Sequence, residues 1–580
     1  MDHRRNSPFG KTPGLHLEEG HISNEITFLL ASDSSSAMPN RINWLFNISS
    51  IYLGIPYLLF FWGWLRWWLA FPIIGLFVYV MVIFIQFVNQ RLKEFPQYSA
   101  GEKQNFWRDI GICLLISLGI SSLSGAGGVG PQHSDYLKHN AVFKHLIESS
   151  WPVWLETNRG NFPLVYYTAW YLPAALVGKW IGWEWGHIAL FGWTFLGIFL
   201  STAWVIVLIK RRILISLIIF FLFSAPESVG AILLKLATGD ISLSQLPVIR
   251  WWNWNIRWWT GPCAWNYGFH LECLFWVPHQ TLGAWISSGM MMTGYFCPSM
   301  RWREWAMVPV MLSALWSPLI TLGLIPFLIA EFLEEFLKEK ENTFAQHDSR
   351  FRVGNICYRI SADWISRINL ASLPILFLLG FYYGSRFGPL PFPEHPWAEF
   401  RFLGFSDWPM SKYLFRLICF LLIEVIIIAG LIFFLRPPTV GRERTLFIAC
   451  ISVLLVLPMF RYGMGNDLGM RVSMPSLFIL SIFWTKILTQ KLPFLRRAIF
   501  AGAVIIAATS PMLELYYHLD SILTRRRWIA IPPIEEVHSL WELNIKYQTN
   551  GKDWFFRQYI GSPETIFFQY LAPSPKEHLR

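Results

Sequence analysis

The sequence predicts an all-α integral membrane protein that crosses the bilayer about 13 times. Of its 580 residues, 54% are hydrophobic and only 15% are charged, whereas soluble chains usually carry about 25% charged residues. A soluble fold cannot bury that much apolar surface, so lipid must cover part of it. The chain also contains 32 Trp, and Trp is enriched where proteins meet the membrane–water interface.

Apolar segments long enough to cross a bilayer recur along the chain. A bilayer core of about 30 Å requires about 20 helical residues. The stretch 305–335 is too long for one straight helix and Pro318 divides it, so we expect two short or broken helices there. We expect 166–183 to dip into the membrane without crossing it. The remaining spans are predicted at 44–65, 67–90, 108–127, 188–209, 213–235, 280–298, 367–387, 412–435, 445–460, 472–491 and 497–517.

Basic residues between these segments set the expected orientation, because cytoplasmic loops are rich in Lys and Arg. With the N-terminus in the cytoplasm, nearly every basic run falls on the cytoplasmic side. Arg66 and the triplet Arg525–Arg527 are the exceptions. The runs that agree are Arg91 to Arg108, Lys210 to Arg212, Arg301 and Arg303, the segment 338–367, Arg436 to Arg444, and Lys491 to Arg497.

This topology divides the chain into three parts. Residues 1–42 form a polar cytoplasmic tail, 43–517 the transmembrane bundle, and 518–580 a short exoplasmic C-terminal tail. The exoplasmic loops, where polar residues concentrate, are 128–165, 236–279, 388–411 and 461–471.

The net charge of +11 does not indicate a nucleic-acid partner. The basic residues lie in short runs between apolar segments, which is how membrane proteins set their orientation. Membrane lipids are therefore the expected surroundings. The compact loops and the lack of an organelle signal favour a bacterial inner (plasma) membrane.

The first exoplasmic loop contains a dense group of polar residues. Its sequence, SGAGGVGPQHSDYLKHNAVF, includes His133, Asp135, Lys138 and His139. If 134–147 is helical, Asp135, Lys138 and His139 share one face, because side chains three and four positions apart are neighbours. A carboxylate beside a cation and an imidazole suits a general base, or an electrostatic clamp with a metal. The alternative is a helix N-cap formed by Asp135 or the serine before it.

This loop and the segment after it resemble polytopic glycosyltransferases of the GT-C class, which carry an Asp in their first exoplasmic loop. The segment NFPLVYYTAWYLPAALVGKWIGW (161–183) is similar to the PPLYY…LLxKLFG stretch of the dolichyl- or undecaprenyl-phosphate-dependent branch, which includes protein mannosyltransferases and aminoarabinose transferases. As in that branch, the next helix ends in basic residues, here Lys210 to Arg212. The specific resemblance covers about 120–212.

The resemblance implies a GT-C-like fold with exoplasmic juxtamembrane helices and a polyprenyl-phosphate-linked sugar as donor. It also implies that Asp135 is the catalytic base. It does not specify the acceptor, which could be a glycan, a lipid or a protein. Many relatives carry a second acidic residue next to this Asp, and the present loop has none. Both a metal-free site and a divalent cation (Mg or Mn) near Asp135 therefore stay open.

The second large exoplasmic loop is rich in Trp and Arg. In RWWNWNIRWWTGPCAWNYGF, Arg250 and Arg257 could hold a phosphate while Trp rings contact a sugar. An interfacial aromatic belt is the alternative. Further along, His279 and Gln280 in VPHQTLG lie where the loop enters a span. This position places a titratable imidazole at the membrane boundary, although a structural His would fit as well.

The glycine-rich turn at 461–471 contains Asn466, Asp467 and Arg471. Charges this close to hydrocarbon are costly and are usually functional or paired. Arg471 suits a lipid phosphate, and an Asp467–Arg471 ion pair is the structural alternative. Glu227 and Glu424 fall within predicted spans, where an isolated carboxylate is a functional hypothesis by default.

Together these features predict a membrane glycosyltransferase that moves a sugar from a polyprenyl phosphate to an exoplasmic hydroxyl, with inversion at the anomeric carbon. The main alternative is a non-catalytic membrane protein, either a structural subunit or a transporter. Transporters usually show paired halves, and the sequence has no such repeat. An oligosaccharide polymerase or ligase is a third option. The expected substrate-binding residues are His133, Lys138, His139, Arg250, Arg257, His279, Gln280, Asn466, Asp467 and Arg471.

Overall fold

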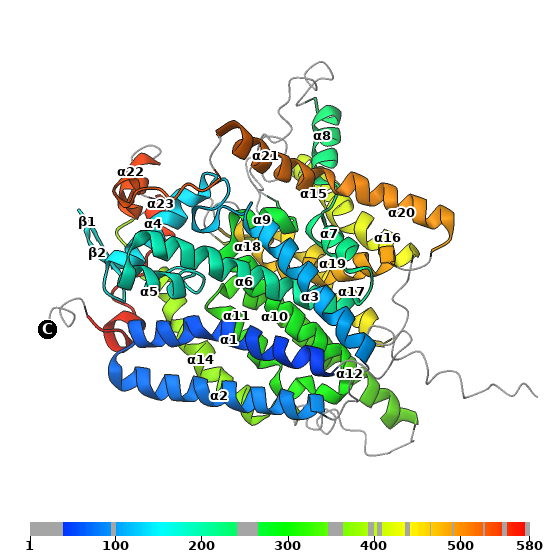
Figure 1. The fold of residues 1–580 in the computed structure, drawn as a ribbon, viewed down its shortest axis with the longest axis horizontal. Helices are drawn as coiled ribbons and strands as arrows, with labels where there is room; N and C mark the ends of the chain where they lie inside the picture. The colour runs from blue at the N-terminus through cyan, green and yellow to red at the C-terminus, as the bar shows by residue number, and fades with distance from the viewer. Residues whose placement is uncertain are drawn as a thin grey trace, which may run out of the picture.

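A computed structural model of the chain describes residues 39–93, 100–239, 265–345, 363–392, 400–402, 409–435, 441–463, 466–489, 492–525, 528–547 and 554–574. Within these ranges the protein is mostly helical (Figure 1). Its strands form two small two-stranded sheets.

Among the described residues, five helices are long and apolar enough to cross a membrane. They are Ile42–Trp64, Trp67–Leu92, Trp183–Ile209, Arg367–Phe387 and Met410–Leu435. A sixth span results if Phe494–Ala507 and Thr509–Thr524, which meet at 43°, are counted as one. The structure therefore confirms a mostly helical chain with several helices able to span a bilayer. The count of 13 crossings stays a prediction.

The first described helices form a hairpin. α1 (Pro39–Trp64) and α2 (Trp67–Lys93) pack side by side (Figure 1), and Leu65 and Arg66 make the turn between them. Next, α3 (Ala100–Ser121) packs against α6 (Trp183–Ile209). These four helices correspond to the first four spans predicted from apolar segment length.

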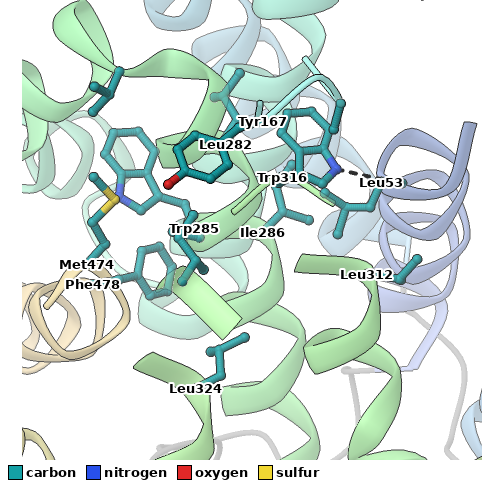
Figure 2. Close-up of a cluster of buried hydrophobic side chains, with 14 of the residues drawn as sticks. Leu53, Tyr167, Leu282, Trp285, Ile286, Leu312, Trp316, Leu324, Met474 and Phe478 are labelled. Atoms are coloured by element: carbon teal, nitrogen blue, oxygen red, sulfur yellow. Dashed lines mark hydrogen bonds between the residues drawn. The ribbon is translucent and has the colours of Figure 1, made fainter. Parts of the chain in front are cut away.

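The centre of the bundle is α10 (Pro278–Phe296), whose side chains are buried from Pro278 to Tyr295. It packs against α6, α11 (Met307–Ala314) and α19 (Met474–Thr489). Figure 2 shows the apolar cluster around Leu282, Trp285 and Ile286. Because protein covers every face of α10, this helix can carry Ser, Thr and Gly that a lipid-facing helix would expose to hydrocarbon.

Glycines allow Trp rings to lie directly on the backbone of α10. A Cβ at Gly283 would lie 2.7 Å from Trp316, and one at Gly289 would lie 2.6 Å from Trp204. Both distances are too short for any side chain beyond hydrogen. Close packing of large rings against a bare helix backbone fixes the position of α10 along its axis.

Two predicted single spans are interrupted. The segment 213–235 consists of α7 (Ile213–Phe221) and α8 (Glu227–Ala237). The segment 497–517 contains parts of α20 (Phe494–Ala507) and α21 (Thr509–Arg525). In contrast, one helix, α19, fills the predicted span 472–491 and directly follows the short helix α18 (Asp467–Val472). In both interrupted spans a proline, Pro226 or Pro511, lies at the start of the second helix. Proline lacks the N–H that would continue a helix but fits its first turn.

The stretch 305–335 forms two helices as expected, α11 and α12 (Pro318–Ala345), with the break just before Pro318. The segment 166–183 contains α5 (Leu172–Ile181), whose ten residues span about 15 Å, too little to cross a bilayer. The remaining long elements are α14 (Arg367–Gly384), α15 (Met410–Leu421), a π-helical turn η7 (Leu422–Ile426), α16 (Ile427–Leu435) and α17 (Gly441–Val456).

Short elements gather at one end of the bundle, called the loop end below. Figure 1 shows α4 and α5 there beside the two strands and the last helices. The strands β1 (Trp154–Thr157) and β2 (Gly160–Pro163) pair antiparallel, as do β3 (Arg401–Phe402) and β4 (Phe460–Arg461). The other elements are α4 (Asp135–Glu148), α9 (His270–Trp276), α22 (Leu540–Lys546), α23 (Trp554–Arg557) and η10 (Phe567–Leu571).

The described residues of 528–574, called the C-terminal strap below, are held to the loop end by backbone hydrogen bonds. The N–H of Ala530 donates to the Gly128 carbonyl (2.8 Å), and the N–H of Val165 donates to the Tyr559 carbonyl (2.8 Å). Arg66 fixes the end of the strap, since its guanidinium donates to the carbonyl of Ala572 (3.1 Å). This contact gives the one charged residue of the first hairpin turn a structural role.

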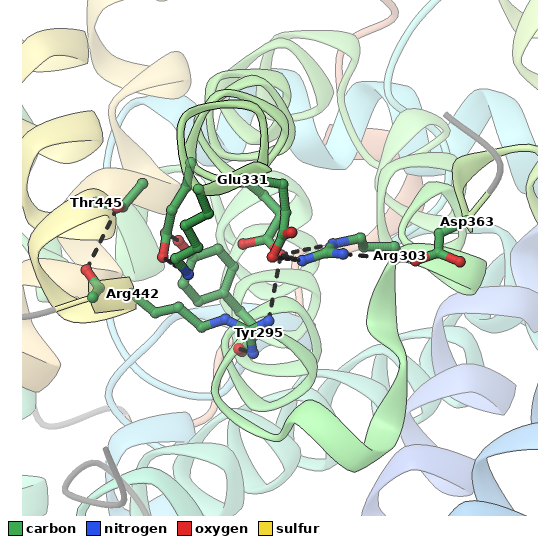
Figure 3. Close-up of polar contacts among 10 residues, drawn as sticks. Tyr295, Arg303, Glu331, Asp363, Arg442 and Thr445 are labelled. Carbon is green, nitrogen blue, oxygen red and sulfur yellow. Dashed lines mark hydrogen bonds and ion pairs between the residues drawn. The ribbon is translucent and has the colours of Figure 1, made fainter. Parts of the chain in front are cut away.

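The opposite end of the bundle holds a buried ion network (Figure 3). The Glu331 side chain is 1% exposed and lies 2.8 Å from Arg303 and 3.5 Å from Arg442. Arg442 also donates to the Tyr295 carbonyl, at the end of α10 (2.6 Å). The 19 residues of α10 rise about 28 Å, so about one bilayer thickness separates this network from the loop end.

We expect Glu331→Gln to lower the free energy of unfolding by about 3 kcal/mol, because it removes the buried carboxylate that pairs with the partly buried Arg303 and Arg442. Thermal or denaturant unfolding in detergent measures the change. Lys338→Ala on the same helix is the control. Its Nζ pairs with Glu334 at the surface (2.6 Å), and such pairs contribute less than about 1 kcal/mol. Equal effects of the two variants would contradict a stabilising role for the network.

Candidate functional site

The loop before Asp135 is a tight glycine turn. Gly125, Gly127, Gly128 and Gly130 all have positive φ. At Gly127 (φ 61°) a Cβ would lie 2.2 Å from the His187 carbonyl of α6, so only glycine fits. The turn therefore lets the chain leave α3, pass close over α6 and begin α4 at the loop end.

Asp135 is the first residue of α4, and its Oδ2 lies 2.6 Å from Nζ of Lys138. The two side chains are 25% and 24% exposed, so solvent or a substrate can reach them. Ser134 precedes the helix without making a side-chain capping hydrogen bond. The capping alternative thus lacks its hydrogen bond, although a carboxylate at this position still interacts favourably with the helix dipole.

Neighbouring groups keep Asp135 ionised. Burial acts to raise the pKa of this carboxyl, but Lys138 and the imidazoles of His133 and His139 outweigh it and hold the pKa below its ordinary value. The carboxylate is therefore available at neutral pH as an acceptor of a proton or a hydrogen bond.

His133 and His139 both anchor α4 to α9. His133 Nε2 lies 2.8 Å from the Phe275 carbonyl, and its ring stacks on Trp276 at 3.7 Å between centroids. His139 Nε2 lies 3.0 Å from the Trp276 carbonyl, and Nδ1 lies 2.6 Å from the Tyr171 hydroxyl. Since carbonyls only accept, Nε2 carries the proton on both rings.

Burial lowers the pKa of His133 to about 4 and that of His139 to about 3. Both imidazoles are therefore neutral at pH 7, and their ring N–H groups are engaged by backbone carbonyls. The structure places these two predicted binding residues beside Asp135, in positions that fix the geometry of the loop end.

His279 lies at the start of α10, between the first loop and the tyrosines of segment 161–183. Its ring is 5.0 Å from that of His139 and stacks against Tyr166 at 5.6 Å. Its Nε2 accepts from the side-chain amide of Gln280 (2.8 Å). Both predicted residues are fully buried, so they connect α4, α10 and the Tyr166 segment.

The third predicted group lies on α18. The Asn466 side chain caps this helix by accepting from the Gly469 N–H, with its own φ at 52°. Arg471 forms an ion pair with Asp467, and its guanidinium lies 6.0 Å from the centre of the Tyr167 ring. The predicted ion pair therefore exists, and it faces the aromatic residues that also surround His279.

Two tyrosines connect the Asp135 and Arg471 groups. The Tyr166 ring packs on Tyr559 from the C-terminal strap at 5.0 Å. Burial raises the pKa of the Tyr559 phenol, and the charges of Asp135 and Arg471 both act on it. The same two charges act on Tyr166. An ionised carboxylate and a buried guanidinium thus act electrostatically on the same pair of phenol rings.

Other predicted residues lie elsewhere. Arg250 and Arg257 are outside the described residues, as is most of the 236–279 loop. Glu227 begins α8 after the break at Pro226, and Glu424 lies in the π-helical turn η7. Both are buried, and their charges act on each other. We assign neither of them to the Asp135 group.

The divalent cation near Asp135 stays a prediction. Within the described part of the chain, no three His, Cys, Asp or Glu side chains are arranged to hold a metal ion. The imidazoles of His133 and His139 are engaged by carbonyls and a phenol.

The histidines predict a loss of stability in acid. The ordinary pKa of His is 6.5, and the folded values are about 4 for His133 and about 3 for His139. Between pH 6.5 and these lower values, the unfolded chain therefore binds more protons than the folded protein. Stability therefore falls as the pH drops below about 6.5, by up to about 1.4 kcal/mol per pH unit for each His. Melting temperatures in detergent at pH 7, 6 and 5 measure this effect.

We expect His139→Gln to weaken this pH dependence. His538→Gln is the matched control, because its imidazole is 49% exposed. An identical slope of melting temperature against pH in the wild type and His139→Gln would contradict the burial argument.

Comparison with known proteins leaves the function to be argued from this geometry. No family model, curated protein or solved structure matches the chain. The site described above, formed by α4, α9, α10, α18 and the C-terminal strap, is therefore the basis for the assignment that follows.

Proposed function

We propose that the chain is a membrane glycosyltransferase that moves a sugar from a polyprenyl-phosphate donor to an acceptor hydroxyl, with inversion. The observation that carries the proposal is that an ionised carboxylate, Asp135, and a buried guanidinium, Arg471, act on the same stacked tyrosines. Tyr166 packs on Tyr559 and on Tyr167, and Arg471 lies over the Tyr167 ring. Such a site offers a base at one side and an anion-binding group at the other.

The proposal includes the GT-C-like topology of about 13 crossings, with the N-terminus in the cytoplasm and the loop end on the exoplasmic side. Support comes from the distribution of basic residues. Lys210 and Arg442 both act electrostatically on Cys297, which directly follows α10. They therefore lie at the end of α10 opposite His279, which is where the positive-inside rule puts the cytoplasm.

The proposed reaction is a single displacement at the anomeric carbon. The acceptor oxygen attacks this carbon while Asp135 takes the hydroxyl proton. The bond between the anomeric carbon and the phosphate oxygen breaks, and its electron pair stays on the phosphate. Arg471 stabilises the negative charge of that leaving group. Attack opposite the leaving group inverts the configuration.

Aromatic residues complete the proposed donor site. Tyr166, Tyr167 and Tyr559 present rings beside the two charged groups, and flat rings contact the apolar faces of sugars. The prenyl tail would lie between spans, in lipid. Neither the sugar nor the acceptor is specified by these contacts.

Asp135→Asn tests the catalytic assignment. We expect sugar transfer to fall by a factor of about 10² to 10⁴, the usual contribution of a general base, because an amide cannot take the proton. Transfer is measured in membranes with a panel of radiolabelled polyprenyl-phosphate sugars. Glu156→Gln, an exposed carboxylate on β1 at the same end, is the control. Undiminished transfer by Asp135→Asn would leave a non-catalytic membrane protein as the better assignment.

Lys138→Met tests how Asp135 is kept ionised. Lys138 lowers the pKa of Asp135, so its loss should raise that pKa and move the acid limb of the pH–rate profile to higher pH. The rate at neutral pH should change much less. Lys144→Met on the same helix is the control, since its ammonium binds the carbonyls of Ile534 and Val537 instead. An unmoved acid limb in Lys138→Met would show that another group controls it.

A further inference from the structure

The helix α21 buries polar side chains on one face and exposes apolar side chains on the other. Ser510, Glu514 and His518 follow one another at intervals of four residues, so they share a face, and all three are buried. This pattern is typical of a helix whose outer face contacts lipid, because ionisable residues of membrane proteins face the protein interior. The exposed side chains on the opposite face are Met512, Tyr516, Leu519 and Leu523.

Two of the buried residues of α21 bind the loop end. Nδ1 of His518 donates to the Leu123 carbonyl, between α3 and the glycine turn (2.8 Å). Oε1 of Glu514 accepts a hydrogen bond from the indole N–H of Trp276, the last residue of α9 (2.8 Å). Nε2 of His518 lies 3.5 Å from the same oxygen. The predicted site residues do not include Glu514, although it falls within the predicted span 497–517.

The ring of Trp276 contacts both Glu514 and His133. Its N–H donates to Glu514, and its face stacks on the His133 imidazole at 3.7 Å between centroids, with 21° between the planes. Nδ1 of His133 accepts from the backbone N–H of Asp135 (3.3 Å). Three consecutive contacts therefore join α21 to the residue proposed as the base.

We propose that Glu514 is a positioning residue, which holds the Trp276 ring in place and thereby fixes His133 and the start of α4 at Asp135. This inference rests on the proposed function and extends it to a residue that acts through its neighbours. Without Glu514, the indole N–H loses its acceptor, and a partly buried donor without a partner is costly. The ring would then turn toward another acceptor and release His133.

The expected consequence is a loss of rate rather than of donor binding. A displacement of about 1 Å at a reacting group can cost a factor of about 10² in rate. The backbone of Asp135 would lose its contact with His133, so the carboxylate would meet the acceptor hydroxyl less often in the productive geometry. The proposed donor contacts at Arg471 and the tyrosines do not involve Trp276, so the KM for the donor should stay unchanged.

Sugar transfer by the full-length protein in lipid nanodiscs tests the inference, with the radiolabelled polyprenyl-phosphate sugar that the wild type transfers fastest. Glu514→Leu removes the acceptor, and Trp276→Phe removes the donor but keeps a ring that can stack on His133. We expect each variant to lower kcat about tenfold. The double variant should be no slower than either single variant, because both remove the same interaction. Glu514→Gln, whose amide oxygen still accepts from the indole, should restore most of the rate.

Hydrogen exchange of the peptide that contains Asp135, followed by mass spectrometry, measures the same coupling without turnover. We expect Glu514→Leu to speed exchange of the amides at the start of α4, because the contact between Asp135 and His133 weakens. Asp520→Asn is the matched control, since it changes an exposed carboxylate on the same helix. Its exchange and its kcat should both equal those of the wild type.

The outcomes separate the inference from the proposed function. If the wild type transfers sugar and Glu514→Leu matches it in kcat and in exchange, the positioning role is overturned and the proposed function stands. A double variant whose losses multiply, or a Glu514→Gln variant as slow as Glu514→Leu, also overturns the role. If Glu514→Leu does not fold, an unchanged kcat in Trp276→Phe overturns it. If the wild type transfers no sugar, the proposed function fails and the inference fails with it.

Discussion

The architecture depends on the complete enclosure of one helix. Every face of α10 is covered by protein, and Trp204 and Trp316 lie directly on its glycines. A helix packed this way cannot slide or rotate without opening voids, which close-packed interiors resist. Its two ends are therefore fixed, and so are the groups attached to them: His279 at one end, and at the other Tyr295, whose carbonyl binds Arg442 of the ion network.

Hydrogen bonds connect the loop end to this fixed helix through α9, which directly precedes α10. The last carbonyls of α9, at Phe275 and Trp276, accept from His133 and His139, and these contacts position α4. Because the imidazoles must stay neutral to keep this arrangement, they orient Asp135 without competing with it for protons at neutral pH. The carboxylate and Lys138 are left as the charged groups at the start of α4, where a substrate could reach them.

Local sequence rules predicted the features that depend on residues close together in the chain, namely ion pairs and helix breaks. Spacing predicted the Asp135–Lys138 and Asp467–Arg471 pairs, and Pro318 predicted the break before α12. The same rule applied to Pro226 and Pro511 would have predicted the other interrupted spans. In contrast, the contacts of Tyr166 with Tyr559, of Tyr167 with Arg471, and of Glu331 with Arg303 and Arg442 join distant segments. No local pattern encodes such contacts, so sequence alone could not predict them.

The C-terminal strap has a consequence for biosynthesis. A chain folds as it is made, with its N-terminal part first, yet Leu540 bonds to His145 across 395 positions, and Tyr559 pairs with Val165. The backbone groups of Gly128 and Val165 must therefore wait unpaired until the last segment has been translated. Closing so long a loop is slow. The candidate site is thus among the last parts of the molecule to form, although most of its residues are synthesised early.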